Sequence, residues 1–247
     1  IIEGNPIPDI FTERAETRRQ SIVNSIDQLE QNRNFPAKFV FTQEIGWIPD
    51  GWSVGKIGDI ANVIDCLHSK KPDRAKSNTG QILLQLNNIC NDGIMNPQEK
   101  YYISEEDYKK WISRIEVHEG DCVITNVGRV GAASIVPKGI KAAIGRNITA
   151  IRLKPDHSCQ AFLITLLTSR YMEKEIQNRT DMGTIMNALN VKSIPQLCFP
   201  QSGNIILELF EDLVFPILKK RQHIKDENIS LQNVQNTLLP ELMFSEH

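Results

Sequence analysis

The stretch Asn204–Leu239, NIILELFEDLVFPILKKRQHIKDENISLQNVQNTLL, carries the pattern that decides the architecture of this 247-residue chain. Apolar residues recur there at every seventh position: Phe210, Ile217, Ile224, Leu231 and Leu238. A seven-residue repeat keeps one seam of a helix turned toward a partner helix. The second seam position lies three residues after the first. It is apolar at Leu213 and Val234, but it is charged at Lys220 and Glu227. The pattern predicts a long helix that packs through one narrow stripe.

This helix would be roughly 50 Å long at a rise of ~1.5 Å per residue, which exceeds the width of a domain of ~150 residues. It is therefore expected to reach beyond its own domain as a spacer or docking arm. An ordinary amphipathic core helix is the alternative, and the length and unbroken register argue against it.

The ends of this helix can also be predicted. Ser202 and Asn204 are candidate N-caps because their side chains can accept a hydrogen bond from the first turn. Pro216 predicts a kink near Asp212, since proline lacks an N–H and clashes with the preceding turn. The pair Leu239–Pro240 predicts the end of the helix.

The composition excludes several classes of protein. With 40% hydrophobic and 23% charged residues, the chain is an ordinary globular one. Its five cysteines are scattered and never in C-x-x-C spacing, which argues against a disulfide framework and a metal site and favours a cytoplasmic location. No apolar run reaches the ~20 residues that span a bilayer, and no signal peptide pattern opens the chain. No membrane partner is expected.

Charge is unevenly distributed along the chain. Residues 52–200 carry 19 Lys and Arg against 15 Asp and Glu, a net of +4. The remaining residues carry 9 against 15, a net of −6. The middle of the chain is therefore the part suited to a polyanion, although the excess is modest.

Three parts of the chain are expected. Residues 1–46 would form a linker and a short helix over Thr12–Gln31, followed by an extended segment that begins near Asn34. Residues 47–200 would form a domain, opened by EIGWIPDGW (Glu44–Trp52), whose tryptophans anchor an entry turn. A ligand-stacking role for these tryptophans is the alternative. Residues 201–247 would form the long helix.

The middle domain is predicted to be α+β, with short strands joined by turns. Residues Trp52–Cys66 read as a strand, a short helix and another strand, although periodicity does not settle their order. Helices are expected at Tyr102–Ile112, capped by Ser104, and at Phe162–Ile176, with Tyr171 on the buried side. Two strands joined by VGRVG (Val127–Gly131) read as a hairpin. Long parallel βαβ units are not evident, so a doubly wound α/β fold is disfavoured.

The chemistry-bearing motifs of common enzymes are missing from the sequence. There is no phosphate-binding loop, no dinucleotide fingerprint, no zinc-protease helix and no nucleophile elbow. VGRVG superficially resembles a glycine loop, but it lies in a hairpin and not at a helix start, which disfavours nucleotide binding. The residues alone therefore predict a binding module, not an enzyme.

The densest basic patch of the middle domain lies in a loop, LHSKKPDRAKSNTG (Leu67–Gly80), which we call the basic loop. Polar residues follow strands or sit in turns elsewhere in this domain. A solvated, structural role is the alternative for each of them. Candidates for contact with a charged ligand are Lys70, Lys71, Arg74, Lys76, Asn87, Asn88, Arg129, Arg146, Asn147, Thr184, Asn187 and Lys192.

Several stretches resemble the DNA-specificity subunit of type I restriction–modification enzymes. They are IEGNPIP (2–8), EIGWIPDGW (44–52), GDCVITNVGRVGAASIV (120–136), GRN (145–147), MGTIMNALN (182–190), IPQLCFP (194–200) and ENISLQNVQNTLLPELM (227–243). Each motif is loose, but their order and spacing together are specific. The resemblance covers nearly the whole chain.

The resemblance implies a function and a set of partners. A target-recognition domain would read double-stranded DNA, with Lys and Arg on phosphates and Arg, Asn, Gln or Thr on base edges. The long helix would set the distance between half-sites and dock methyltransferase and restriction/translocase subunits. S-adenosylmethionine, ATP and Mg²⁺ would belong to those partners, and this chain would need no cofactor of its own. We predict from the sequence that Arg129→Ala weakens specific DNA binding.

Members of that family usually carry two recognition domains and two long helices, whereas this chain has one of each. It is expected to be either a half-subunit that self-associates through the long helix or the C-terminal half of a longer protein. Two other classes stay open. One is a decoy or scaffold that binds partner subunits and ignores DNA, and the other is a fragment of a fused methyltransferase–recognition enzyme.

Overall fold

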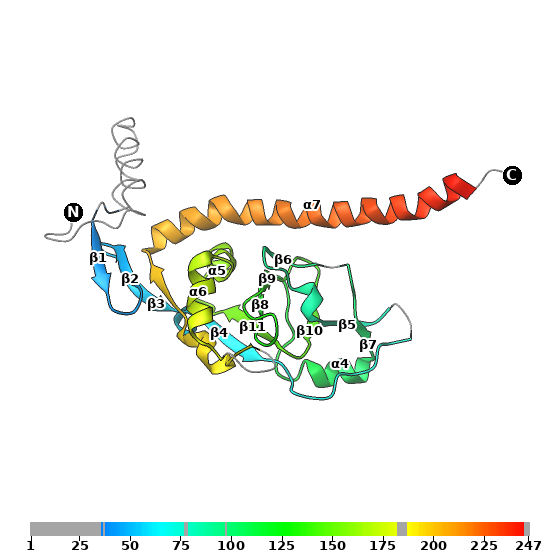
Figure 1. Cartoon of the computed structure of the whole chain (residues 1–247), viewed down its shortest axis with the longest axis horizontal. Coiled ribbons are helices and arrows are strands. Elements are labelled where there is room, and N and C mark those ends of the chain that lie inside the picture. The colour runs from blue at the N-terminus through cyan, green and yellow to red at the C-terminus, as the bar shows by residue number, and fades with distance from the viewer. Residues whose placement is uncertain (1–35, 37, 77–78, 97, 182–186, 245–247) are drawn as a thin grey trace.

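A computed structural model describes residues 36, 38–76, 79–96, 98–181 and 187–244, with side chains only up to residue 239 in the last helix. The chain folds as an α+β body along which one long helix lies (Figure 1). The predicted helix over Thr12–Gln31 lies outside the described residues, as does Thr184. Within the described residues, no helix combines the length and the apolar character that crossing a bilayer requires.

The largest sheet has five strands in the order β4-β11-β8-β9-β6, and all neighbours are antiparallel except β9 and β6. Their bounds are β4 Ala61–Asp65, β6 Gly93–Ile94, β8 Cys122–Thr125, β9 Ala133–Ile135 and β11 Ile148–Leu153. The predicted hairpin is confirmed as the pair β8 and β9, with Val127–Gly131 as its connection. Gly128 and Gly131 both have positive φ there, at 79° and 87°, which explains why glycine is needed.

A second sheet has three strands in the order β10-β5-β7, and β10 runs parallel to β5. Its strands are β5 Gln81–Leu84, β7 Tyr102–Ile103 and β10 Ala142–Ile144. The short turn η2, Leu86–Asn88, follows β5. Helix α4, Glu105–Trp111, buries Tyr108 and Trp111 against this sheet and is capped by Ser104 as predicted, whose Oγ accepts from Asp107 N at 3.1 Å.

The remaining strands form three two-stranded pairs. They are β1 Phe39–Thr42 with β2 Gly46–Pro49, β3 Ser53–Lys56 with β14 Cys198–Gln201, and β12 Thr180–Asp181 with β13 Ala188–Leu189. The predicted strand, helix and strand in Trp52–Cys66 is confirmed as β3, α3 Ile57–Ile60 and β4. In the entry turn the buried anchor is Ile48, while Trp47 is half-buried and packs edge-on against Phe41. The segment before the long helix consists of the turn η3, Val191–Gln196, followed by β14.

The predicted single helix over Phe162–Ile176 is wrong. Two helices occupy this region, α5 Gln160–Leu167 and α6 Arg170–Asn178. Ser169 separates them because its Oγ accepts from Met172 N and so caps the start of α6. Tyr171 was expected to be buried, but it lies on the exposed side of α6.

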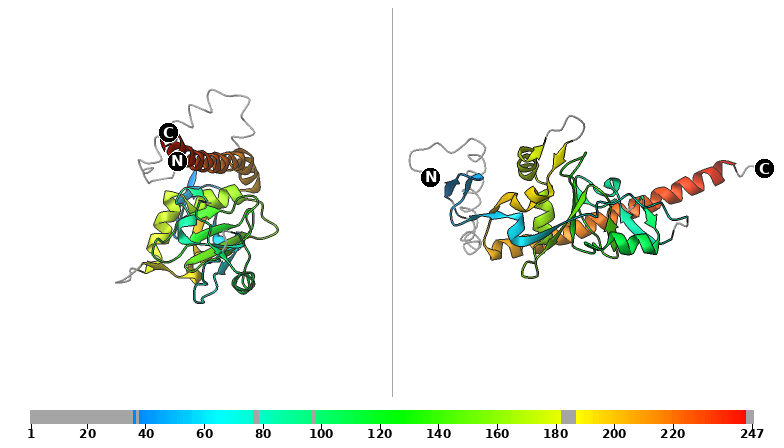
Figure 2. Two further views of the ribbon diagram at one scale, coloured as in Figure 1. Left: turned by 90° about the vertical axis from the view of Figure 1, so that its right-hand side faces the viewer. Right: turned by 90° about the horizontal axis from the view of Figure 1, so that it is seen from below.

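The long helix is α7, Asn204–Phe244, of 41 residues. It continues through Pro216 without a break, and its predicted end at Leu239 is wrong because it reaches Phe244. Within the described residues, neither the Ser202 nor the Asn204 side chain accepts a hydrogen bond from the first turn, and the Ser202 hydroxyl donates to Gly203 O at 3.4 Å instead. The cap position is Gly203, whose carbonyl accepts from Ile206 N at 3.1 Å. Figures 1 and 2 show its C-terminal part projecting past the body.

Two different stripes run along α7. The inner one, which includes Phe210, Val214, Phe215 and Leu218, packs on the core of the five-stranded sheet and α5. Farther along, Arg221, Gln222 and Lys225 make polar contacts with residues 90–95 of the body. The seven-residue seam faces solvent instead, apart from Phe210. We call this the outer stripe, and its exposed members are Leu213, Ile217, Ile224, Leu231, Val234 and Leu238.

Glu211 fastens the inner face of α7 to the start of α5. Its two carboxylate oxygens accept from Ala161 N and Phe162 N at 3.0 and 2.7 Å. The N-terminus of a helix favours an anion, but burial outweighs these bonds and raises the pKa of Glu211 above its ordinary 4.5. The folded state therefore binds the Glu211 proton more tightly than the unfolded chain does.

This difference predicts a pH dependence of stability. As the pH falls through the raised folded pKa of Glu211, the wild type should gain stability relative to Glu211→Gln, which does not titrate. The gain should be complete below the unfolded pKa of the side chain. Urea unfolding of both proteins at a series of pH values between 7 and the acid limit measures it. Parallel stability curves for the two proteins would contradict the prediction.

Candidate nucleic-acid interface

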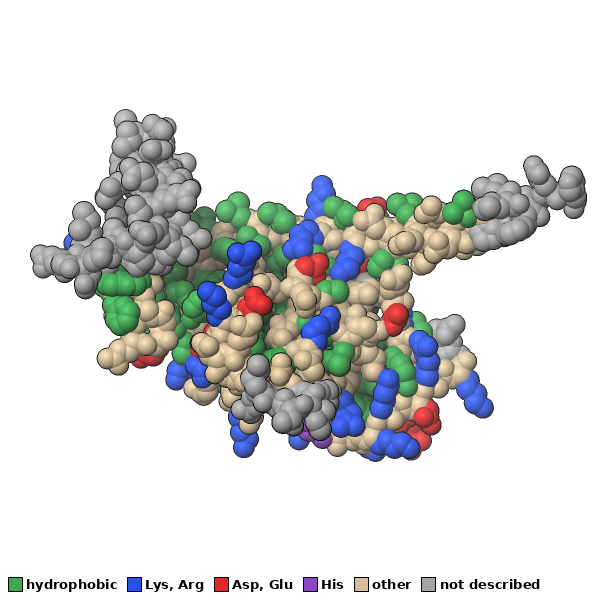
Figure 3. All heavy atoms as spheres, viewed as in Figure 1, with side chains coloured by type: hydrophobic (Ala, Val, Ile, Leu, Met, Phe, Trp, Pro, Cys, Tyr) green, Lys and Arg blue, Asp and Glu red, His purple; other side chains and the backbone are tan. Residues whose placement is uncertain are grey.

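The basic loop lies on the opposite side of the body from α7, along the lower edge in Figure 1. Lys70, Lys71, Arg74 and Lys76 are all exposed there, and Figure 3 shows Lys and Arg side chains along this lower edge. Exposed cations that project from one loop can neutralise a series of phosphates. The predicted basic patch is therefore accessible.

The basic loop is not free in space, because it is held against β7 and the residues before it. Lys71 Nζ lies 4.0 Å from the centre of the Tyr101 ring, and Arg74 Cζ lies 5.5 Å from it. The Tyr101 hydroxyl donates to Pro72 O at 2.9 Å, and Arg74 Nη2 donates to Lys100 O at 2.6 Å. The path of the loop is thereby defined.

A pocket of about 390 Å³ lies where the basic loop meets the ends of β5 and β10. We call it the Arg146 pocket. It brings together four of the residues predicted from the sequence, which come from three separate segments. Its polar lining consists of Lys71, Gln85, Asn87, Arg146 and Asn147, and the buried Trp111 also lines it.

The turn between β10 and β11 gives the Arg146 pocket its shape. Gly145 N donates to Leu84 O at 2.9 Å, and a Cβ at Gly145 would lie 2.4 Å from that same oxygen. Only glycine permits this approach. Asn147 then turns the chain at a φ of 67°, a conformation that asparagine tolerates better than most residues. Arg146 stands exposed between them.

The polar groups of the Arg146 pocket differ in their availability. Within the described part of the chain, the Arg146 guanidinium makes no hydrogen bond or ion pair. Asn87 donates through Nδ2 to the Glu99 carboxylate, and the Gln85 amide donates to Leu84 O at 3.1 Å. Arg146 is therefore the side chain best placed to bind a ligand that enters the pocket.

Asn88 must be removed from the set of candidates. Its side chain is only 3% exposed. Its Nδ2 donates to Asn96 O and Glu99 O at 3.0 and 2.9 Å, and its Oδ1 accepts from Gln85 N at 2.8 Å. Both amide hydrogens are used inside the protein, so Asn88 holds the turn η2 together instead of facing a ligand.

Arg129 is exposed, but part of its guanidinium is used inside the protein. Its Nη2 donates to Leu86 O at 2.8 Å and also to Ile89 O. The guanidinium thus joins the VGRVG connection to η2, the turn that carries Asn87. Any effect of Arg129 on binding is therefore expected to act through the position of η2.

A second hollow of about 600 Å³ lies on the other side of the VGRVG connection, and we call it the Arg129 groove. Asn187 lines it together with Arg129, and Asn187 O accepts from Gly128 N at 3.0 Å. Thr168 and Ser169, at the junction of α5 and α6, and Gln177 of α6 supply further polar groups. Lys192 lines neither hollow and lies exposed on η3.

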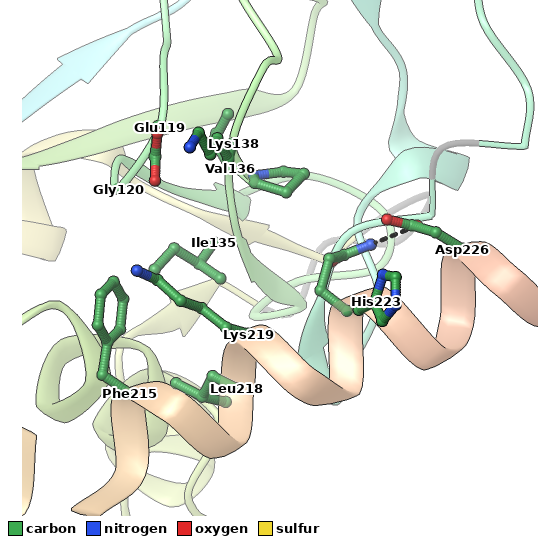
Figure 4. Close-up of a pocket in the computed structure, with 12 residues that line it drawn as sticks. Glu119, Gly120, Ile135, Val136, Lys138, Phe215, Leu218, Lys219, His223 and Asp226 are labelled. Carbon is green, nitrogen blue, oxygen red and sulfur yellow. Dashed lines mark hydrogen bonds between the residues drawn. The ribbon is translucent and has the colours of Figure 1, made fainter. Parts of the chain in front are cut away.

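A third hollow, of about 400 Å³, lies between α7 and the segment that follows β9 (Figure 4). Phe215 and Leu218 form its apolar wall. The negative charges of Glu119 and Asp226 balance the positive charges of Lys138 and Lys219. Gln222 donates to Met95 O at 3.2 Å and to Asp226 Oδ1 at 2.9 Å beside it. This hollow lies where α7 packs against the body, and its side chains carry no net charge that would favour a polyanion.

Among the residues that the structure describes, one group of side chains could meet a metal ion: Asp65, Cys66 and His68, whose donor atoms lie within 4.8 Å of one another. His68 Nε2 already pairs with Asp65 Oδ2 at 2.6 Å. Burial raises the pKa of the Cys66 thiol, which disfavours the thiolate that binds metals. These contacts explain why the three residues lie together without a metal ion. All five cysteines are free thiols.

Three residues of the interface were not among the sequence-based candidates: Gln85, Tyr101 and Trp111. Tyr101 lies thirty positions from Lys71 along the chain, and Trp111 looks like an ordinary core residue in its helix. No local pattern connects these residues to the basic loop. Their proximity follows from the pairing of β5 with both β7 and β10.

No family model matches this chain, and no curated protein matches it. Among solved structures, the S subunit of a type I restriction–modification system from M. genitalium is similar over 78% of this chain and 46% of its own, with a TM-score of 0.54 and 16% identity. This chain has the fold of the type I specificity subunits. That likeness concerns the fold, because the sequence identity is low.

Two further structures match over 94% of this chain. The HsdS subunit from Thermoanaerobacter tengcongensis has 16% identity, a TM-score of 0.47 and 55% of its length covered. A chain from a study of complex assembly and conformational transition of the type I R-M system has 17% identity, a TM-score of 0.49 and 56% covered. The chain therefore spans about half the length of the structures it resembles.

Proposed function

We propose that this chain is a sequence-specific DNA-recognition module of a type I restriction–modification system. The body, residues 47–200, reads one half-site of double-stranded DNA. The helix α7, within the region 201–247, serves as the spacer, and the chain performs no bond chemistry itself. The observation that carries the proposal is the Arg146 pocket, where an unpaired guanidinium stands beside the basic loop.

The chemistry of the pocket supports this role. Arg is the side chain that most often reads guanine, through a bidentate contact with O6 and N7. The basic loop beside it supplies cations for phosphates, which fix orientation without reading sequence. A pocket that combines one free Arg with neighbouring Lys residues fits a base edge flanked by a phosphate backbone better than it fits a neutral small molecule.

The outer stripe of α7 supports the second half of the proposal, which is docking. Six apolar side chains are exposed along one side of a helix that projects past the body. Such a stripe is expected to be covered in the assembled protein. Methyltransferase and restriction/translocase subunits are the partners we propose for α7. A second copy of this chain, meeting α7 through the same stripe, is a further candidate.

Titration of the whole chain against a labelled duplex library, at ionic strengths from about 50 to 300 mM, tests the DNA-binding role. Binding should enrich one sequence class and weaken steeply with salt, because each neutralised phosphate contributes about −0.9 to the slope of log K against log salt. A chain that binds methyltransferase subunits but ignores every duplex would instead be a decoy or scaffold of the same fold.

Self-association through the outer stripe gives a separate prediction. Ile224→Lys combined with Leu231→Lys should raise the dissociation constant of the self-associated form at least about 100-fold, since burying each Leu or Ile contributes ~1.5–3 kcal/mol. Sedimentation velocity measures the association. Asn236→Lys is the matched control, because Asn236 is exposed on another side of α7 and should change little. A monomeric wild type would contradict this prediction and leave the stripe to another partner.

A further inference from the structure

Tyr101 contacts the basic loop at three points within four residues, 71–74. The ring faces Lys71 Nζ and Arg74 Cζ at 4.0 and 5.5 Å from its centre, both within the ~6 Å reach of a cation–π interaction. The hydroxyl donates to the carbonyl of Pro72, which lies between the two cations in sequence. One aromatic side chain therefore holds both the backbone and two charged side chains of this loop.

We propose that Tyr101 is a positioning residue for DNA, which holds Lys71 and Arg74 in the arrangement in which they meet two phosphates. The inference rests on the proposed DNA-binding function. Tyr101 itself is half-buried beneath the loop and would act only through these two cations.

The physical reason is the mobility of long basic side chains. A lysine or arginine that is free in solution must lose rotamer freedom when it binds a phosphate. An aromatic face attracts the cation while leaving its N–H groups free to donate elsewhere, so the side chain is ordered before the ligand arrives. Arg74 is further fixed by its 2.6 Å hydrogen bond to Lys100 O.

The position of Lys71 links Tyr101 to the recognition of the DNA sequence. Lys71 also lines the Arg146 pocket, so the residue that Tyr101 holds stands beside the guanidinium proposed to read a base. A phosphate bound at Lys71 would fix the register of the duplex relative to Arg146. Loss of Tyr101 should therefore weaken all DNA binding and also reduce the preference for the specific sequence.

The test uses the full chain and a duplex that carries the sequence enriched from the library. Tyr101→Leu should weaken binding about tenfold and lower the salt slope by up to about 1.8, the value for two lost phosphate contacts. Tyr101→Phe keeps the ring and should bind within about twofold of wild type. Tyr171→Leu is the matched control, since Tyr171 also donates its hydroxyl to a backbone carbonyl, Cys198 O at 3.0 Å, but far from the basic loop in sequence.

A double-variant comparison separates positioning from a general loss of structure. Tyr101→Leu should have no further effect on DNA affinity in a chain that already carries Lys71→Ala and Arg74→Ala. An equal loss in both backgrounds would overturn the inference, as would wild-type binding and salt slope in Tyr101→Leu. Thermal unfolding of each variant checks that it is folded. Absence of duplex binding by the wild-type chain would overturn the proposed function itself, and this inference with it.

Discussion

Arg152→Ala is expected to lose about 3 kcal/mol of unfolding free energy. Arg152 Nε and Nη2 donate to the two oxygens of Asp121 at 2.7 and 2.6 Å, and Nη2 also donates to Glu116 O at 2.8 Å. The Asp121 hydrogen bond is the main reason that the pKa of Arg152 is raised. The pair joins β11 to the start of β8 in the central sheet.

The loss arises mainly from what the variant leaves behind. The Asp121 side chain is 4% exposed, so without Arg152 a carboxylate would stay buried with one backbone donor, His118 N. Arg152 is one third exposed, which places the expected cost at the low end of the range for buried pairs. Chemical unfolding by urea, followed by circular dichroism, measures it.

Arg179→Ala is the matched control for this measurement. Arg179 is exposed to nearly the same degree, and it also makes two hydrogen bonds to one carboxylate, that of Glu175 one turn away on α6. The Glu175 side chain is less buried than Asp121, at 15% exposed, and without Arg179 it keeps a hydrogen bond from Cys198 N. Loss of Arg179 should therefore cost less than about 1 kcal/mol. Adding Asp121→Asn to Arg152→Ala should restore part of the loss. If the double variant were as unstable as Arg152→Ala alone, the uncompensated charge would not be the cause.

The second large effect is expected on specific DNA binding. Arg146→Ala should reduce affinity for the preferred sequence by about 1–3 kcal/mol and relax the preference at one base pair, as loss of a bidentate Arg–guanine contact does. Binding to unrelated duplex should fall much less, because only one positive charge is removed. Competition titrations with single-base variants of the enriched duplex measure both quantities.

Lys192→Ala removes the same charge from a place outside the Arg146 pocket and serves as the control. If Arg146→Ala and Lys192→Ala had equal effects on all duplexes, Arg146 would contribute charge only and would not read a base. Arg146→Lys distinguishes further, since it keeps the charge but loses the planar fork. Arg129→Ala, predicted from the sequence to weaken binding, should act through η2 and therefore also lower thermal stability.

Local sequence patterns predicted several elements correctly because short-range interactions determine them. The glycines of VGRVG permit the positive φ angles of the connection between β8 and β9. Ser104 caps α4 through a bond to its own first turn. The same kind of interaction was missed at Ser169, where a cap inside an apolar run divides one expected helix into two.

The lining of the Arg146 pocket was predicted only in part. The basic loop and the GRN turn stand out as charge and turn chemistry in the sequence, and Lys71, Asn87, Arg146 and Asn147 do line one pocket. Their relative availability could not be predicted, because it depends on partners that are distant in the sequence. The carbonyls of Leu86 and Ile89, 43 and 40 positions away, accept hydrogen bonds from Arg129, and internal hydrogen bonds occupy Asn88.

The sequence by itself determined that a long helix with a seven-residue apolar repeat ends the chain, because helical periodicity is a local property of residue spacing. Only the tertiary structure decided which side of that helix meets the body. The core of the five-stranded sheet accepts Phe215 and Leu218 of the inner stripe, and this leaves Leu231 of the repeat 66% exposed. Both stripes are apolar, so the choice between them depends on the shape of the packed body, which no spacing along the chain encodes.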